Sequence, residues 1–352
     1  MASLTETAYY SRKIIKYGSI VIVALLIMRS IVISASAYWR KLHPPPLPAA
    51  TVAFGKLPKI KFPTRTGLPT ISLRTETIEG TFPKLADRIK VYFMPGVSPN
   101  LLAIENAKTF AKKLGFTGEP EILNQFTLKY YSDNNPKTIV EINALTNNFS
   151  LSYNWKEDVN IINQGNPPPE SQAIALAKSL LENYDVLSDN LAKGEQKVTY
   201  LKYNQGNLET TQFFSEANFA RVDFFKESLE DHKLLPPNPK IGNVSMLLSA
   251  SVNNRDNKEV VDIKYTNYPV SLTKTATYPL KDVNEAWSQL AAGKGFIANL
   301  GNNIDGKVIV RKAYLAYYDS DAAQDFLQPI IVFEGDRDFF AYVPAVTDNW
   351  IE

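Results

Sequence analysis

The chain contains no cysteine and only two histidines, His43 and His232, among its 352 residues. Without cysteine there can be no disulfide, zinc–thiolate site, iron–sulfur cluster or cysteine nucleophile. His43 lies beside a run of prolines, where no neighbouring structure would hold its ring in place. The chain therefore has too few histidines for a histidine metal cluster, and a catalytic triad would depend on one histidine. We expect no catalytic residues, no cofactor, no metal site and no enzymatic activity.

The charges are balanced, which bears on the class of partner. A net charge of +2 gives little support for a nucleic-acid surface, which needs clustered lysines and arginines, so we expect no nucleic-acid partner. Hydrophobic residues make up 45% of the chain and charged residues 21%, as in ordinary globular proteins. After a tail, a span and a linker, about 280 residues remain for one large domain or two to three small ones.

Residues 17–39 read YGSIVIVALLIMRSIVISASAYW, and this run is long and apolar enough to cross a bilayer. Arg29 inside it costs about 2.5–3.5 kcal/mol, whereas the Ile, Leu and Val residues together return about 4–5 kcal/mol, so insertion is favoured. Tyr38 and Trp39 suit the aromatic belt at the membrane boundary. Arg29 either snorkels to the headgroups or pairs with an acidic group in a partner span.

The orientation of this span is not decided by charge, because basic residues lie on both sides of it: Arg12, Lys13, Lys16, Arg40 and Lys41. A short basic segment before a single apolar run is typical of a signal anchor. We therefore expect residues 1–16 in the cytoplasm, an anchor in the cell membrane and an extracytoplasmic body. The alternative is a cleavable signal with an A-x-A site at 35–37, although Arg29 disfavours it.

Residues 40–70 form a proline-rich linker, with prolines at 44, 45, 46, 48, 58, 63 and 69. Proline fixes φ and removes a donor, so this composition predicts a stiff spacer between membrane and body. The alternative is that residues 52–62 lie extended on the surface of the body.

The body alternates between helical periodicity and runs of period two. Helices are predicted after Ser98-Pro99, after the prolines at 167–169 and from Asp282, with stops at Gly115 and Gly293. Strands rich in aromatic and β-branched residues follow each helix, with a turn predicted at 133–136, and two more precede the first helix. We expect an α+β fold in which a helix packs on each antiparallel meander, in modules at 71–165, 166–275 and 276–352. The alternative is that the middle strands form a separate sheet with its own core.

A helix that ends in Gly-Phe and leads into an aromatic meander resembles the PepSY-type modules of membrane-anchored extracytoplasmic bacterial proteins. The C-terminal stretch is similar to the last module of the YycH/YycI regulators, through segments at 285–293, 313–318, 327–333 and 341–346. The resemblance covers about 65 residues as a pattern of apolar and aromatic positions. It implies a single-span protein that regulates a membrane partner, and it transfers no catalytic residue.

Four polar clusters were weighed as sites. Asp319, Asp321 and Asp325 are close enough to hold Ca²⁺, but the loop lacks the glycine and glutamate of an EF-hand, which favours a solvated acidic turn. Residues 334–338 are predicted as a hairpin turn. Residues 230–233 include His232 but offer it no nucleophile. The glycosylation patterns at Asn148 and Asn243 lie in predicted strands.

The function expected from these observations is a non-enzymatic, membrane-anchored, extracytoplasmic binding or regulatory protein of the cell envelope. Its partners would be the lipid bilayer and a protein or peptide, which aromatic side chains on exposed strands might bind by edge addition. The alternatives are a structural component of a surface assembly and a carboxylate-dependent envelope hydrolase.

Overall fold

The structure is a computed structural model that describes residues 4–42, 49–96, 101–132, 138–158, 161–162, 165–250 and 259–352. The chain divides into two compact units, Met1–Ala49 and Ala50–Glu352. The prolines at 44–48, His43, the Ser98-Pro99 cap and the turn at 133–136 lie outside the described residues.

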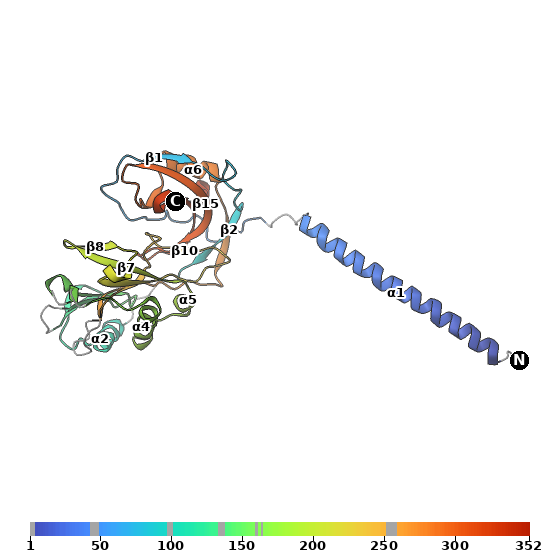
Figure 1. Cartoon of the computed structure of the whole chain (residues 1–352), viewed down its shortest axis with the longest axis horizontal. Coiled ribbons are helices and arrows are strands. Elements are labelled where there is room, and N and C mark those ends of the chain that lie inside the picture. Colours follow the sequence, from blue (N-terminus) through green and yellow to red (C-terminus); the bar gives the residue numbers. More distant parts are fainter. Residues whose placement is uncertain are drawn as a thin grey trace. The chain divides into compact units, whose positions relative to one another are not determined.

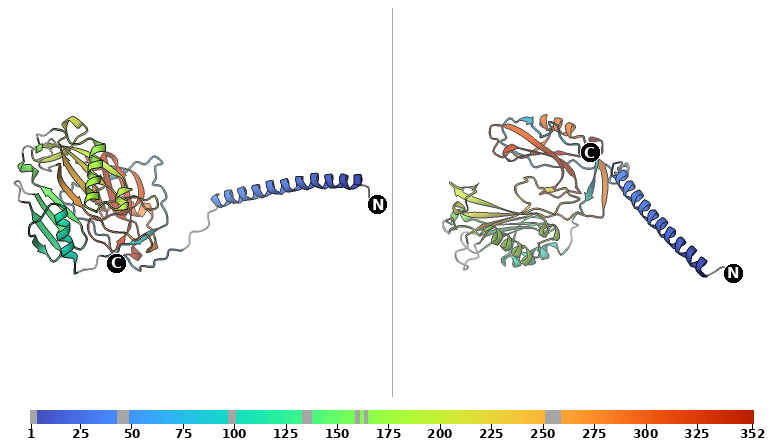
Figure 2. Two further views of the ribbon diagram at one scale, coloured as in Figure 1. Left: turned by 90° about the horizontal axis from the view of Figure 1, so that it is seen from below. Right: turned by 45° about the vertical axis from the view of Figure 1, so that its right-hand side comes forward.

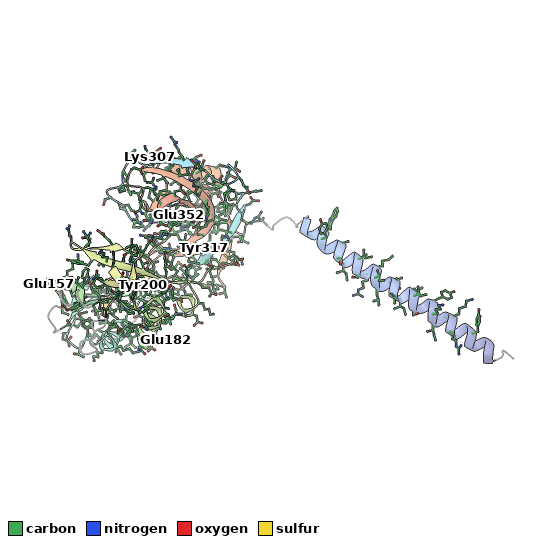
Figure 3. The ribbon with its side chains drawn as sticks, viewed as in Figure 1. Glu157, Glu182, Tyr200, Lys307, Tyr317 and Glu352 are labelled. Carbon is green, nitrogen blue, oxygen red and sulfur yellow. The ribbon has the colours of Figure 1, made fainter. Side chains whose placement is uncertain are left out.

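The first unit is built on one helix, α1 (Leu4–Leu42). Its segment Arg12–Ser36, of 25 residues, is long and apolar enough to cross a membrane. Large apolar side chains such as Leu25 and Leu26 are about 60% exposed and project from all sides of the helix (Figure 3). A helix that is apolar all round has no stable place in water, so its composition is compatible with single-pass membrane anchoring. The helix already begins at Leu4, inside the segment expected as a tail.

The largest element of the second unit is a nine-stranded antiparallel sheet (Figure 1). Its strands, in spatial order, are β3 (Glu121–Asn124), β4 (Thr127–Tyr131), β5 (Thr138–Asn143), β6 (Phe149–Tyr153), β12 (Val260–Tyr265), β11 (Val244–Ser249), β9 (Phe219–Phe224), β7 (Gln196–Asn204) and β8 (Asn207–Thr210). β6 pairs with β12, with Ser150 opposite Lys264. The strands expected in the first and middle modules therefore share one sheet, and the alternative of a separate middle sheet is wrong.

Three helices cover one face of this sheet: α2 (Ala103–Lys113), α4 (Glu170–Asn183) and α5 (Asp189–Ala192) (Figure 1). Their buried stripes are largely alanine, with Ala107 and Ala177 fully buried, so the helices approach the strands closely. In each half of the sheet a helix precedes the strands, and the two last strands, β6 and β12, meet antiparallel at the centre. On the opposite face the buried Ile161 and the half-buried Trp155 pack with Leu201 and Leu247.

A second sheet has six strands in the order β1 (Ser72–Thr75), β15 (Lys307–Tyr318), β17 (Pro329–Gly335), β18 (Phe339–Pro344) and β14 (Phe296–Asn299), with β10 (Leu234–Leu235) also on β15. The β1 and β10 pairings are parallel and the others antiparallel. Helix α6 (Val283–Ala291) packs on this sheet, and the Asp282 side chain caps it by accepting a hydrogen bond from the Asn284 amide at 2.8 Å. β17 and β18 form the hairpin predicted at 334–338.

A small third sheet consists of β13 (Thr275–Pro279), β2 (Arg88–Phe93) and β16 (Phe326–Leu327). The right-hand view of Figure 2 separates the nine-stranded sheet and its helices from the six-stranded sheet. The second unit is therefore α+β with mostly antiparallel sheets, as expected, although β14 returns to lie beside β18 and departs from a simple meander.

The described part of the expected spacer belongs to the body. Leu57 is fully buried, bridges to Ile351 and packs with Tyr278. Phe62 stacks on Phe296 with ring centroids 4.8 Å apart and planes 4° from parallel. From Ala50 onward the segment thus lies on the body, as in the alternative for residues 52–62. The reason is that its apolar side chains, which lie between the prolines, pack into the core clusters of the body.

Candidate functional site

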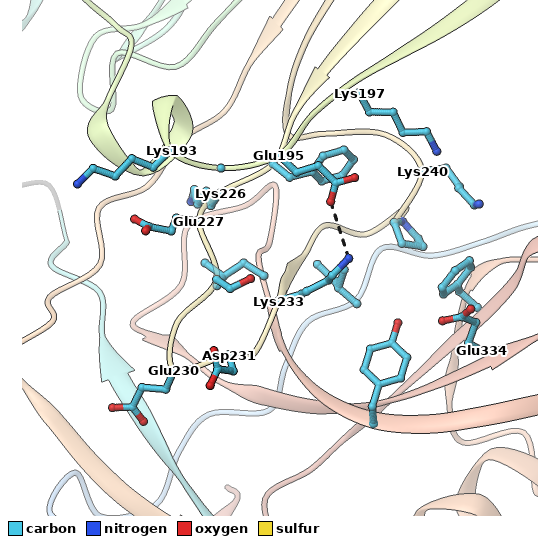
Figure 4. A pocket seen from close by; sticks show the side chains of 18 residues that line it. Lys193, Glu195, Lys197, Lys226, Glu227, Glu230, Asp231, Lys233, Lys240 and Glu334 are labelled. Carbon is cyan, nitrogen blue, oxygen red and sulfur yellow. Dashed lines mark ion pairs between the residues drawn. The ribbon is translucent and has the colours of Figure 1, made fainter.

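A cleft of about 670 Å³ lies where the two large sheets approach each other (Figure 4). Its walls are the segment leading into β7, the connection that follows β9 and passes through β10, and the face of the six-stranded sheet that carries Tyr314, Glu334 and Phe340. A volume of this size lies within the usual range of ligand sites.

Two local backbone features shape the cleft. A Cβ at Gly194 would lie 1.8 Å from the Phe225 carbonyl oxygen, so only glycine lets the two segments approach this closely. Leu229 and His232 exchange backbone hydrogen bonds of 3.0 and 2.9 Å around a tight turn. Glu230 and Asp231 in this turn have φ of +48° and +66°, a left-handed conformation that costs non-glycine residues of the order of 1–2 kcal/mol each. The turn places two adjacent carboxylates on the cleft wall.

The cleft is lined by equal numbers of lysines and carboxylates, namely Lys193, Lys197, Lys226, Lys233, Lys240, Glu195, Glu227, Glu230, Asp231 and Glu334. Lys197 and Lys240 lie together on one side of it, whereas Glu230 and Asp231 lie on the other side (Figure 4). Glu195 and Lys233 approach across the middle, at 3.8 Å. The lining of the cleft is therefore neutral in total, with lysines and carboxylates on both sides of it.

Neighbouring groups hold part of this charge in place. Glu230 is paired with Lys90, and Lys240 is paired with Asp338. Lys197 is exposed and enters none of the ion pairs in the described part of the chain. Exposed ion pairs are weak, typically below about 1 kcal/mol, so an incoming charged group can replace them.

One ion pair at the back of the cleft is buried. Lys226 Nζ lies 2.8 Å from Asp319 Oδ1, and the two side chains are only 2% and 6% exposed. The Asn243 amide nitrogen donates to the Asp319 carbonyl oxygen at 2.7 Å, and Lys226 donates to the Tyr268 carbonyl at 3.3 Å. Lys226 and Asn243 adjoin the nine-stranded sheet while Asp319 follows β15, so this network joins the two sheets beside the cleft.

Asp319 is therefore not in a solvated acidic turn, because a buried lysine and an amide hold its oxygens. Asp321 is exposed and lies 3.7 Å from Lys264, and Asp325 is also exposed. Among the described residues no group of three or more histidine and acidic side chains could hold a metal ion. Asn243 is 6% exposed and uses its amide in this network, so its glycosylation pattern is not accessible in this structure.

Two further polar side chains, Tyr314 in the cleft and His232 beside it, have defined partners. Burial raises the pKa of Tyr314 well above its usual value, and a hydrogen bond with Glu334 raises it further. Tyr314 therefore stays neutral at physiological pH and serves as a hydrogen-bonding group. His232 Nδ1 lies 2.8 Å from the Glu230 carbonyl oxygen, and its ring meets Tyr317 edge to face at 6.1 Å. This arrangement can bind charged and polar groups of both signs.

Of the candidate residues named from the sequence, the structure brings Glu230, Asp231, Lys233 and Glu334 to the cleft. Sequence reasoning missed Lys197, Lys226 and Tyr314, which belong to no motif and meet only because β7, the β9–β10 connection and β15 converge.

Neither protein-family models nor curated proteins match this chain. A crystal structure of an uncharacterized protein from Eubacterium rectale resembles it with a TM-score of 0.35 and 9% sequence identity. The match covers 78% of this chain and 89% of that one.

Proposed function

We propose that this is a non-enzymatic, single-pass membrane protein whose extracytoplasmic body binds a partner protein through a peptide segment in the cleft. The observation that carries the proposal is the cleft itself, which is open, polar and lined by side chains of both charge signs. A peptide segment with an acidic and a basic side chain matches such a lining, because each charge would meet its opposite.

The membrane helix supports the rest of the proposal. An anchored body works close to other envelope proteins, which raises the effective concentration of a membrane-bound partner. The helix-first halves of the large sheet and the similarity of residues 285–346 to YycH/YycI regulators favour a regulatory role, in a PepSY-like protein, over a catalytic one.

Two lysines on different faces allow a matched test. Lys197 is exposed in the cleft, and Lys112 is exposed on α2, remote from the residues that line the cleft. The full chain, with Lys197→Glu or Lys112→Glu, is purified from membranes with its bound proteins. We expect Lys197→Glu to lose a partner that Lys112→Glu retains. Equal recovery from both variants, or equal loss, would count against the cleft.

A further inference from the structure

The face of the nine-stranded sheet opposite α2, α4 and α5 carries two depressions that share one tryptophan. One, of about 220 Å³, is lined by Trp155, Leu201, Leu208, Arg221, Ser245, Leu247 and Asp262. The other, of about 290 Å³, is lined by Ile139, Ser152, Tyr153, Asn154, Trp155 and Lys156. Neither includes a residue of the cleft between the sheets. Each is smaller than the usual site for a drug-sized ligand, which suits a small unit of a longer molecule.

Trp155 separates the two depressions and is held by other aromatic rings. It opens a short 3₁₀ turn directly after β6. Tyr203 meets it edge to face at 5.7 Å, and Phe219 lies against it at 5.0 Å. The exposed Lys156 side chain places its ammonium 5.6 Å from the ring centre, where a ligand can displace it. Trp155 is thus a fixed, half-buried apolar plate at the surface.

The polar side chains of Asp262 and Arg221 line the depression beside the Trp155 ring. Asp262 lies between Ser152 on β6 and Leu247 on β11 in the strand register. It accepts a hydrogen bond from the Ser152 hydroxyl, and burial raises the pKa of its carboxyl. Arg221 lies on β9, on the far side of Leu247, so its backbone is about 10 Å from that of Asp262, two strand spacings away.

Arg221 is also fixed, because its Nε donates to Asp223 at 2.8 Å and one Nη donates to the Lys240 carbonyl at 3.2 Å. Asp223 neutralises the guanidinium charge, and Lys264 lies beside Asp262. The floor therefore offers hydrogen-bond donors and acceptors with nearly balanced charge. An aromatic ring beside planar polar side chains is suited to bind a sugar, because a sugar ring has an apolar C–H face and hydroxyls around its edge.

We propose that this face binds a neutral oligosaccharide, with Trp155 between two adjacent sugar units and Asp262 and Arg221 bonding the hydroxyls of one unit. The balanced charge disfavours a strongly anionic or cationic chain. The two depressions flanking one ring require a ligand of at least two units. The site shares no lining residue with the cleft, so binding of a sugar here can be tested separately from the proposed peptide partner.

The test measures binding of two defined probes, the tetramers of glucose and of N-acetylglucosamine, to the full chain in lipid nanodiscs. Sugar-headgroup detergents are avoided because they would compete. Calorimetry and saturation-transfer NMR are run with probe up to about 10 mM. We expect at least one tetramer to bind, and its monomer to bind at least tenfold more weakly because only one depression is filled.

Three variants locate the site. Trp155→Ala and Asp262→Asn should each weaken binding about tenfold or more, as expected when a hydrogen bond to a charged group or an aromatic contact is lost. Lys112→Ala, on the helix-covered side, should leave binding unchanged. Asp262→Asn keeps the shape of the side chain, so it tests the site even if Trp155→Ala fails to fold. Absence of binding by the native chain, or equal binding by the native chain and Asp262→Asn, would overturn the proposal.

Discussion

Removing the lysine of the buried Lys226–Asp319 pair should strongly destabilise the body. In the substitution Lys226→Met, Asp319 keeps its hydrogen bonds from Asn243 but loses the cation that compensates its charge. Breaking a buried pair from one side typically costs about 3–5 kcal/mol, because the remaining charge is left in a poorly solvated place. The free energy of unfolding should fall by about this amount.

The expected fall in melting temperature follows from this loss of free energy and from the number of residues in the body. An entropy of unfolding of about 2.1 cal/mol/K per residue, taken over about 300 residues, makes 3–5 kcal/mol equal to about 5–8 °C. The assay is thermal unfolding of the full chain in detergent, followed by near-ultraviolet circular dichroism. The double substitution Lys226→Met with Asp319→Leu should recover most of the loss, since it leaves no unpaired charge.

An exposed ion pair of the same cleft supplies the control. Lys233 and Glu195 are 3.8 Å apart, and their side chains are 64% and 63% exposed. Lys233→Met should therefore cost less than about 1 kcal/mol. A loss in Lys226→Met no larger than that in Lys233→Met would refute the reasoning that this pair joins the two sheets. The pair also lies at the cleft, so Lys226→Met should weaken partner recovery as well.

Three further outcomes are expected. Leu57→Ala should lower the free energy of unfolding by about 2–5 kcal/mol in urea titrations, because Leu57 is fully buried. Leu68→Ala in the same segment should change it by less than about 1 kcal/mol, because Leu68 is 39% exposed. Equal effects of the two substitutions would indicate that the segment does not pack on the body. Gly301→Ala should destabilise more than Gly206→Ala in the same titration, because both have positive φ but only at Gly301 would the new Cβ lie 1.9 Å from a backbone oxygen. Burial raises the pKa of the Asp262 carboxyl in the folded protein above its value of 3.8 in the unfolded chain. The protonated carboxyl therefore contributes its full stabilisation below pH 3.8, and this contribution is lost as the pH rises and the buried group becomes charged. Asp262→Asn should thus exceed the native chain in stability at neutral pH and converge with it below pH 3.8, and a constant difference across this range would contradict the pKa assignment.

Local patterns were enough to predict a long apolar helix near the N-terminus and most of the body's elements. Arg29 is the one charged residue in the sequence 17–39, and α6 begins at the cap predicted at Asp282. The hairpin at 334–338 was also evident, because its turn residues lie between two apolar runs. In each case the decisive interactions lie within a few residues of each other.

The joining of strands was not predictable in the same way. β6 pairs with β12 although the two strands were assigned to different modules, because a strand's partner depends on which apolar faces meet in the core. Asp319 resembled a solvated turn because its partner Lys226 is 93 residues away in the sequence. Leu57 and Phe62 lie in a segment whose prolines predicted a stiff spacer, and their burial favours the alternative, in which residues 52–62 lie on the body.

The binding surfaces were the least predictable part. The cleft is composed of common surface residues, and only the convergence of β7, the β9–β10 connection and β15 gives them a shared site. The position of the Trp155 ring is similarly fixed by contacts with Tyr203 and Phe219, which lie on other strands. No spacing in the sequence links these residues.

The most direct test of the central claim is photo-crosslinking from inside the cleft in intact cells that make the protein. A benzophenone amino acid replaces Glu195, which points into the cleft (Figure 4), and in a second strain it replaces Lys112 on α2. A partner peptide joined at residue 195 and absent at residue 112 is the result this account predicts. Adducts at residue 112 alone, or the same adducts at both positions, would contradict it.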